Sequence, residues 1–240
     1  MDSPESSPAG PSRTSPAVAS AASPQSEFSP TFERWRSRFA EVTGLGLSEA
    51  QKAERTQREE QAKLERDWER CQKWKEELMT RSPMVVFMLK HLRLSGCPFP
   101  DSAIQCHPCP DNRVGGFAPE YGILLCQNRF FSKKHMEDTL AHELIHAYDH
   151  CKFNVDWLNL RHHACTEIRA ANLSGDCSWT REVKRGFYAF NKQHQACVKR
   201  RAVLSVIANP SCESQEMAEK VVNEVWESCS NDTRPFDEIY

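Results

Sequence analysis

Apolar residues recur at helical spacing along most of the chain. Within residues 139–150, Leu140, Leu144 and Ala147 are three or four positions apart, so a helix places them on one face. Such a stripe can pack on a core, and the repetition of this pattern predicts a mostly helical protein. Helices are expected at residues 48–81, 84–94, 133–150, 159–173, 178–194, 197–208 and 215–229.

One short segment has a β pattern instead. Residues 113–128 carry apolar residues on both sides of a turn at 119–122, which predicts a hairpin whose second strand covers 123–126. The edge of such a hairpin can hold an extended peptide through main-chain hydrogen bonds, although an ordinary scaffold hairpin has the same pattern. Residues 97–110 are rich in Cys and Pro and are expected to form a loop. Helices with one small sheet predict an α+β fold.

The N-terminal third differs in composition from the rest. Residues 1–30 are rich in Ser, Pro and Ala, which predicts a disordered tail. Residues 31–82 form a charged helical region, and residues 83–240 form the main domain. The long helix predicted before residue 82 has a thin apolar stripe that either packs on the main domain, the commoner use of such spacing, or docks a partner. The stripe consists of Leu64, Trp68, Cys71, Trp74 and Leu78.

A shorter amphipathic helix is predicted just after the tail. Between Phe32 and Phe39, aromatic residues are interleaved with Arg34, Arg36 and Arg38, and Gly44 ends the segment. This pattern fits a membrane surface, and it fits packing on the body of the protein at least as well.

Charge and hydropathy exclude several classes of protein. The formal net charge of −2 gives no reason to expect nucleic-acid binding. No run of about 20 apolar residues exists, so any membrane association is expected to be peripheral. The N-terminal residues lack the apolar core of a secretory signal, and Arg13 is the only base in a segment that makes a poor mitochondrial transit peptide.

Eleven cysteines are many for 240 residues. Ten lie between Cys97 and Cys229 and could form five disulfides, whereas Cys71 stands alone in a charged stretch. The alternative is a structural zinc site at the Cys-x-x-Cys pair Cys106 and Cys109, which lacks a second such pair. A disulfide-rich chain without a secretory signal fits the mitochondrial intermembrane space.

The most informative motif is His-Glu-Leu-Ile-His at residues 142–146. In a helix, residues four apart lie on the same face, so His142 and His146 can bind one metal ion. Glu143 lies one position further round, within reach of a water molecule beside that ion. Two imidazoles suit one catalytic Zn²⁺, and a carboxylate can take a proton from water and deliver it to a leaving amine. The motif is therefore typical of a zinc peptidase.

Zinc in such a site needs a third protein ligand. His150 cannot join His142 and His146, because eight residues at 1.5 Å per residue place it about 12 Å along the helix from His142. Glu167, in the next predicted helix, is the preferred third ligand. Three other residues remain possible as the third ligand: His163, Asp156 and Asp149. The two aspartates could instead orient a ligating imidazole.

Longer stretches resemble a known family. They are Gly-Gly-Phe at 115–117, Ile-Leu-Leu-Cys-Gln-Asn at 123–128, His-Glu-Leu-Ile-His-Ala-Tyr-Asp at 142–149, much of residues 156–177 and Thr-Arg-Pro-Phe at 233–236. Over about residues 83–240 the chain resembles the mitochondrial inner-membrane metalloproteases that process and help to assemble ATP synthase, and it resembles the fungal members most.

The resemblance implies a zincin-like metalloprotease core, stapled by disulfides. It implies one catalytic Zn²⁺ held by His142 and His146, with Glu143 as the catalytic acid and base. It also implies peripheral attachment to the inner membrane on the intermembrane-space side, after import through the disulfide-relay machinery. The implied partners are the precursor of ATP synthase subunit 6, which loses its N-terminal extension, and the subunit 9 ring, which subunit 6 joins with help that does not need proteolysis.

Two other functions remain open from the sequence. One is an assembly factor that binds its partner without cutting it. The other is a nuclear or cytosolic zinc protein linked to DNA repair, as the resemblance to some animal relatives implies, and free thiols would favour it.

Overall fold

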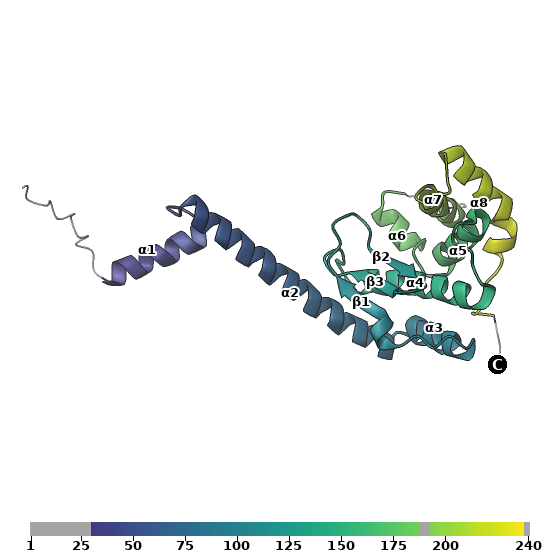
Figure 1. Cartoon of the computed structure of the whole chain (residues 1–240), viewed down its shortest axis with the longest axis horizontal. Coiled ribbons are helices and arrows are strands. Elements are labelled where there is room, and N and C mark those ends of the chain that lie inside the picture. Colours follow the sequence, from purple (N-terminus) through teal and green to yellow (C-terminus); the bar gives the residue numbers. More distant parts are fainter. Residues whose placement is uncertain (1–29, 188–192, 238–240) are drawn as a thin grey trace, which may run out of the picture. The chain divides into compact units, whose positions relative to one another are not determined.

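The computed structural model describes residues 30–187 and 193–237 (Figure 1). The predicted tail at residues 1–30 therefore lies outside the described residues except for Pro30. The chain divides into two compact units, Met1–Thr56 and Gln57–Tyr240. Among the described residues, no helix combines the length and the apolar character that crossing a membrane requires.

The first unit contains α1 (Pro30–Thr43) and the start of α2 (Glu49–Arg81). Helix α1 confirms the amphipathic helix predicted before Gly44, which follows it with a φ of 74°. Ser48 begins α2 through a reciprocal cap. Its hydroxyl accepts a hydrogen bond from the Gln51 backbone N–H, and the Gln51 side chain accepts one from the Ser48 N–H.

The second unit contains the rest of α2 and all later elements. Its further helices are α3 (Pro83–Leu94), a 3-10 turn (Asp101–Ala103), α4 (Lys133–Phe153), α5 (Leu160–Leu173), α6 (Trp179–Lys184), α7 (Gln193–Ile207) and α8 (Gln215–Ser230). Its strands are β1 (Ile104–His107), β2 (Gly115–Ala118) and β3 (Gly122–Cys126). The helix predicted at residues 178–194 is wrong in length, because α6 ends at Lys184 and α7 begins at Gln193.

The three strands form one small sheet in the order β1-β3-β2. Strands β2 and β3 pair antiparallel, which confirms the predicted hairpin, and β1 pairs with β3 in parallel. The loop predicted at residues 97–110 is therefore wrong in part, since it contains β1. Gly122 begins β3 with a φ of 86°, and a Cβ there would lie 2.2 Å from the Ala103 carbonyl oxygen, so only glycine allows this close approach.

The stripe predicted on α2 is only partly correct. Cys71 and Leu78 are buried, but Leu64 and Trp68 are exposed. Lys75 is buried on the same face as Cys71, because its ammonium group donates to the Ile104 carbonyl oxygen at 3.1 Å. Contact with β1 thus selects a face of α2 that apolar spacing alone does not identify.

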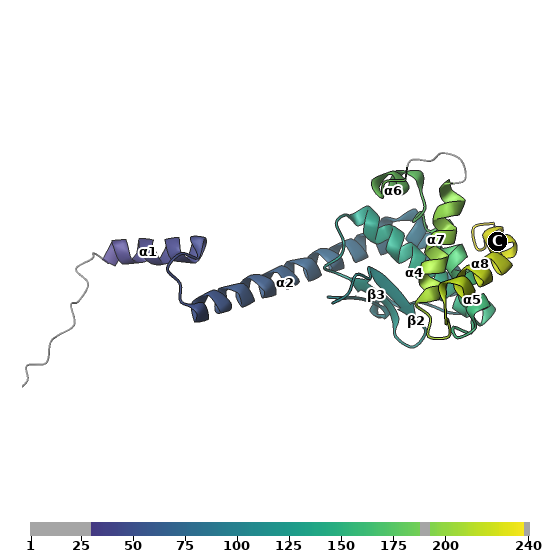
Figure 2. The same cartoon turned by 90° about the horizontal axis from the view of Figure 1, so that it is seen from above.

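Two hydrophobic clusters divide the second unit into lobes. In the N-terminal lobe, α3 and the sheet pack on α4 around buried residues that include Met88, Leu125 and Leu140. In the C-terminal lobe, α5, α7 and α8 pack together around Ile168 and Val198. Helices α4 and α5 contact each other where the lobes meet, as both views show (Figures 1 and 2). The predicted α+β, mostly helical fold with a small sheet is confirmed.

Each of the five disulfides lies within one lobe. The N-terminal lobe has Cys71–Cys106, Cys97–Cys151 and Cys109–Cys126, and the C-terminal lobe has Cys165–Cys229 and Cys177–Cys197. The predicted number of disulfides is confirmed, but Cys71 is paired and Cys212 is the free thiol. The alternative zinc site at Cys106 and Cys109 is wrong, because both residues are in disulfides.

Candidate metal centre and catalytic pocket

The His-Glu-x-x-His motif lies on α4 at the junction of the two lobes. His142 and His146 are one helical turn apart, and 8% and 4% of their surfaces are exposed. Glu167, on α5, faces both imidazoles and is also buried. All three line a pocket of about 530 Å³ together with Glu143. The predicted preference for Glu167 agrees with this placement.

The donor atoms of the three residues converge on one point. The two Nε2 atoms of His142 and His146 are 3.1 Å apart, and the Glu167 carboxylate oxygens lie 3.6 and 3.5 Å from them. Burial alone would raise the pKa of Glu167, but the neighbouring imidazoles hold it well below its usual value. The carboxylate is therefore ionised, and the cluster can hold one metal ion.

A chain of buried polar groups fixes the tautomer of His146. Its Nδ1 lies 2.9 Å from the Thr166 hydroxyl oxygen, and that hydroxyl donates to Asp149 at 2.8 Å. Because a hydroxyl has one proton to give, Thr166 must accept from the Nδ1–H of His146. The Nε2 lone pair is then free to face His142 and Glu167, as a metal ligand requires.

Asp149 therefore orients His146 through Thr166 and does not reach the metal position. Arg169 donates from Nε to both oxygens of Asp149, at 3.0 and 3.1 Å, and both side chains are almost fully buried. Burial raises the pKa of Asp149 above its usual value, although Arg169 and Thr166 act in the opposite direction. The prediction that Asp149 orients an imidazole describes this arrangement better than the prediction that it is a ligand.

His142 is oriented by a residue that the sequence did not single out, Asp176. The Asp176 carboxylate lies 3.5 Å from Nδ1 of His142 without a hydrogen bond, so it acts on the ring through its negative charge, and Nε2 lies on the side of Glu167. Burial opposes ionisation of Asp176, but His142 and three arginines hold its pKa below the usual value. No motif spacing connects Asp176 with His142. In the sequence, only the neighbouring Cys177, a potential disulfide cysteine, indicates that Asp176 lies in an ordered part of the fold.

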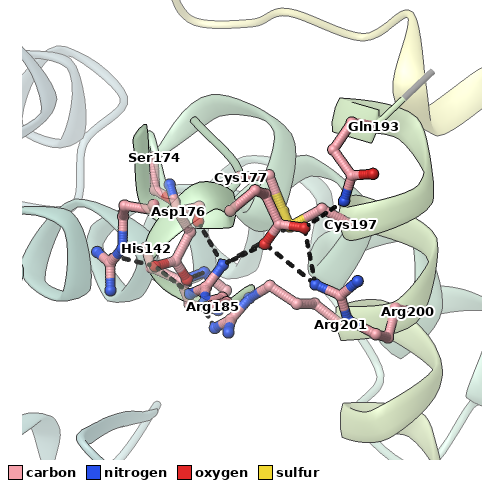
Figure 3. The surroundings of a disulfide bond; sticks show 11 residues. His142, Ser174, Asp176, Cys177, Arg185, Gln193, Cys197, Arg200 and Arg201 are labelled. Atoms are coloured by element: carbon pink, nitrogen blue, oxygen red, sulfur yellow. Dashed lines mark hydrogen bonds and ion pairs between the residues drawn. A yellow bond between two sulfur atoms is a disulfide. The ribbon is translucent and has the colours of Figure 1, made fainter. Parts of the chain in front are cut away.

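Three arginine side chains surround Asp176, and one of them, Arg181, also contacts Asp138 of α4 at 2.7 Å. Arg201 approaches it to 2.6 Å, Arg181 to 3.2 Å and Arg185 to 3.9 Å. Figure 3 shows Asp176, Arg185 and Arg201 beside the Cys177–Cys197 disulfide, which joins the segment after α5 to α7. This disulfide therefore fixes the backbone of the residue that orients His142.

Glu143 lies between α4 and strand β2. It is 7% exposed, and burial raises its pKa to about 7, with Glu167 and Asp176 adding to the effect and His146 opposing it. Strand β2 approaches closely because Gly115 has no side chain. A Cβ at Gly115 would lie 2.9 Å from the Thr139 methyl carbon and 3.6 Å from a Glu143 oxygen.

The other candidate ligands lie outside the three-residue group. His163 contacts Glu167 at 3.4 Å through Nε2, and its Nδ1 lies 2.9 Å from the Asn209 side chain. Asp156 is exposed, and one of its oxygens accepts a backbone hydrogen bond. His150 packs beside the rings of Phe117 and Trp157, in agreement with its exclusion as a ligand.

Known proteins match this chain over most of its length. The model of the peptidase M76 family matches residues 69–237. A protein of Malassezia globosa named mitochondrial inner membrane protease ATP23 is 59% identical over 188 residues, which cover 70% of this chain and 76% of that protein. Proteins of the same name from Neosartorya fischeri and Kluyveromyces lactis are 50% and 49% identical over 212 and 224 residues. They cover 88% and 87% of this chain, and 89% and 90% of their own lengths.

No solved structure matches the chain. The family match contains the α4 motif, Glu167 and Asp176, so it covers every residue of the site just described. Because the family model matches residues 69–237 and the three relatives are 49–59% identical to this chain, the chain belongs to the peptidase M76 family.

Proposed function

We propose that this protein is a zinc-dependent endopeptidase. The observation that carries the proposal is the convergence of His142, His146 and Glu167 on one point in the pocket that also contains Glu143. Two imidazole lone pairs and a carboxylate repel one another at these distances unless a cation lies between them. Membership of a peptidase family supports the same activity independently.

The donor set fits Zn²⁺ in chemistry and in spacing. Two imidazoles and one glutamate form one of the known ligand sets of catalytic zinc. Tetrahedral bonds of about 2.0–2.1 Å place ligand atoms about 3.3–3.4 Å apart, and the observed separations are 3.1, 3.5 and 3.6 Å. Zinc held there would polarise the scissile carbonyl and lower the pKa of the attacking water.

The other groups of the pocket supply proton transfer and substrate binding. Glu143, which lines the same pocket, is the proposed general base: it would accept the proton of the attacking water and return it to the leaving amine. Strand β2 is an edge of the sheet and lines the pocket with Gly115, Gly116 and Phe117. Its outer main-chain groups are placed to bind an extended substrate segment by strand addition.

The proposed substrate is the precursor of ATP synthase subunit 6, from which the protein removes the N-terminal extension. We also propose that it assists the joining of subunit 6 to the subunit 9 ring without proteolysis. The site of action is the intermembrane-space side of the inner membrane, with peripheral attachment. Support comes from the sequence resemblance, from relatives that are named mitochondrial inner membrane protease, and from five disulfides, which favour an oxidising compartment.

Metal content tests the zinc site directly. Oxidised wild-type protein is expected to contain about one zinc ion per chain, and Glu167→Gln is expected to lose most of it because one of three ligands is replaced. Elemental analysis measures the zinc, and a thiol count in the same preparation confirms oxidation. Glu120→Gln makes the same change at an exposed position and should keep the zinc. Zinc retained by Glu167→Gln would exclude Glu167 as a ligand, and a zinc-free oxidised wild type would exclude the zinc peptidase.

The close approach of β2 to Glu143 gives a second prediction. Gly115→Ala is expected to lower kcat/KM for peptide cleavage by about tenfold or more, because its methyl group must displace Thr139 or the strand that faces Glu143. Gly116→Ala is the comparison on the same strand: a Cβ there meets no protein atom within 4 Å, so it leaves the approach of β2 to Glu143 unchanged and reports only on contact with the substrate. Steady-state kinetics on one peptide would compare the two variants. Equal activities would show that the β2 approach does not position Glu143.

A further inference from the structure

Helix α1 has an exposed aromatic face that the catalytic site does not use. Phe32, Trp35, Phe39 and Val42 follow at spacings of three and four residues, so they lie on one side of the helix. They are 42%, 59%, 45% and 77% exposed. None of the residues of α1 is buried.

The aromatic rings of this face form a continuous row. The rings of Phe32 and Trp35 are stacked with centroids 6.0 Å apart, and those of Trp35 and Phe39 are stacked with centroids 5.4 Å apart. Tryptophan and phenylalanine on one face of a helix, opposite a charged face, are typical of helices that lie in a membrane interface.

The charges of α1 are arranged around that face by sign. At about 100° per residue, Arg34 and Arg36 lie about 100° to either side of Trp35, and Arg38 lies about 60° from it. Glu33 and Glu41 lie about 160° and 120° from Trp35, on the far side. Arg36 and Arg38 therefore border the aromatic face, and Glu33 and Glu41 lie furthest from it. Arg34 lies further round, about 20° from Glu41, and its long side chain can reach back toward the face.

This order of charges complements an anionic lipid surface. Arginines that border an apolar face can extend to lipid phosphates while the rings enter the acyl region, and carboxylates on the opposite side stay in water. Arg36 also contacts Glu33 at 3.1 Å, but both groups are solvent-accessible, so that ion pair competes weakly with phosphate.

We propose that α1 is the membrane-binding element of this protein and lies in the surface of a bilayer that contains anionic phospholipid. Phe32, Trp35 and Phe39 insert below the phosphates, and Arg34 and Arg38 bind them. The proposal rests on the proposed peripheral attachment and supplies its physical basis. A single helix of 14 residues gives reversible binding that added salt weakens, as a peripheral protein requires.

Vesicle flotation with the full oxidised chain tests this inference. Wild-type protein is expected to float with vesicles of phosphatidylcholine and phosphatidylglycerol and to float much less with phosphatidylcholine alone. The double variant Trp35→Ser/Phe39→Ser is expected to bind the anionic vesicles at least about tenfold more weakly, because it removes most of the inserted ring area. Arg34→Gln/Arg38→Gln is expected to lose the preference for anionic lipid and its dependence on salt.

The control replaces apolar residues that are equally exposed elsewhere. Tyr121→Ser/Leu204→Ser removes side chains that are 78% and 61% exposed, and it should bind vesicles like wild type. Equal binding by the Trp35→Ser/Phe39→Ser variant would overturn the inference. Failure of wild type to bind anionic vesicles would overturn it too, and would assign the face to a protein partner instead.

Zinc content and cleavage of a soluble peptide separate this inference from the peptidase proposal. Both should be unchanged in the α1 variants, because α1 contributes no residue to the catalytic pocket. Weak vesicle binding with normal cleavage in wild type would contradict only the membrane role of α1. Normal vesicle binding without zinc or cleavage would contradict only the peptidase.

Discussion

Replacement of Glu143 by Gln is expected to lower kcat/KM for peptide cleavage by about 10²- to 10⁴-fold, the usual contribution of a general base. The amide keeps the shape of the side chain but cannot accept a proton from the attacking water. Zinc content should stay at the wild-type level, because Glu143 is not among the three converging donors. Steady-state kinetics with a peptide that contains the cleavage site, together with elemental analysis, would measure both effects.

Glu120→Gln is the control for this experiment, since it makes the same chemical change at an exposed turn. Cleavage by Glu143→Gln at a rate close to that of wild type would exclude Glu143 as the base. The variant also separates the two proposed activities in mitochondria. Retained assembly of subunit 6 with the subunit 9 ring would support an independent assembly role, whereas loss of both would make assembly depend on proteolysis.

Replacement of Arg169 by Met is expected to lower the free energy of unfolding by about 3–5 kcal/mol, because it leaves the buried Asp149 without its charged partner. Both side chains are at most 2% exposed. Arg169 also donates to the carbonyl oxygens of Asp232 and Arg234, so the variant loses the bonds that hold the C-terminal segment. Urea unfolding of the oxidised protein, followed by circular dichroism, would measure the change.

The matched control for Arg169 lies on the same helix. Arg161→Met removes an ion pair with Glu224 in which the arginine is 65% exposed, and it should cost less than about 1 kcal/mol. Adding Asp149→Asn to Arg169→Met should recover part of the loss, since no buried charge is then left unpaired. Equal effects of Arg169→Met and Arg161→Met would show that the buried pair contributes nothing beyond a surface pair.

The catalytic motif could be predicted from the sequence because its geometry is local. A spacing of four residues fixes the relative positions of His142 and His146 on any helix. Glu167 could be favoured because it lies in the next predicted helix, where a zinc peptidase commonly has its third ligand. Their roles as ligands, and that of Glu143 as base, remain predictions that the zinc and kinetic measurements decide.

The rest of the site depends on tertiary contacts that no spacing encodes. Asp176 reaches His142 because α4 and the segment after α5 meet at the lobe junction, and Thr166 reaches His146 for the same reason. Strand β1 could not be predicted from local sequence, because its four residues form a strand only by pairing in parallel with β3, further along the chain. The pairing of Cys71 with Cys106 could not be predicted, because the number of cysteines does not show which of the eleven stays unpaired.

The confinement of every disulfide to one lobe has a consequence for how the protein matures. The cysteines of the N-terminal lobe end at Cys151 and those of the C-terminal lobe begin at Cys165, so the cross-links of the two lobes do not interleave along the chain. A chain that enters a compartment with its N-terminus first can therefore finish oxidising one lobe before the other arrives. The contact of α4 with α5, which brings Glu167 to the two imidazoles, joins these separately oxidised lobes. A metal ion bound by the proposed site would then link two lobes that are each already cross-linked.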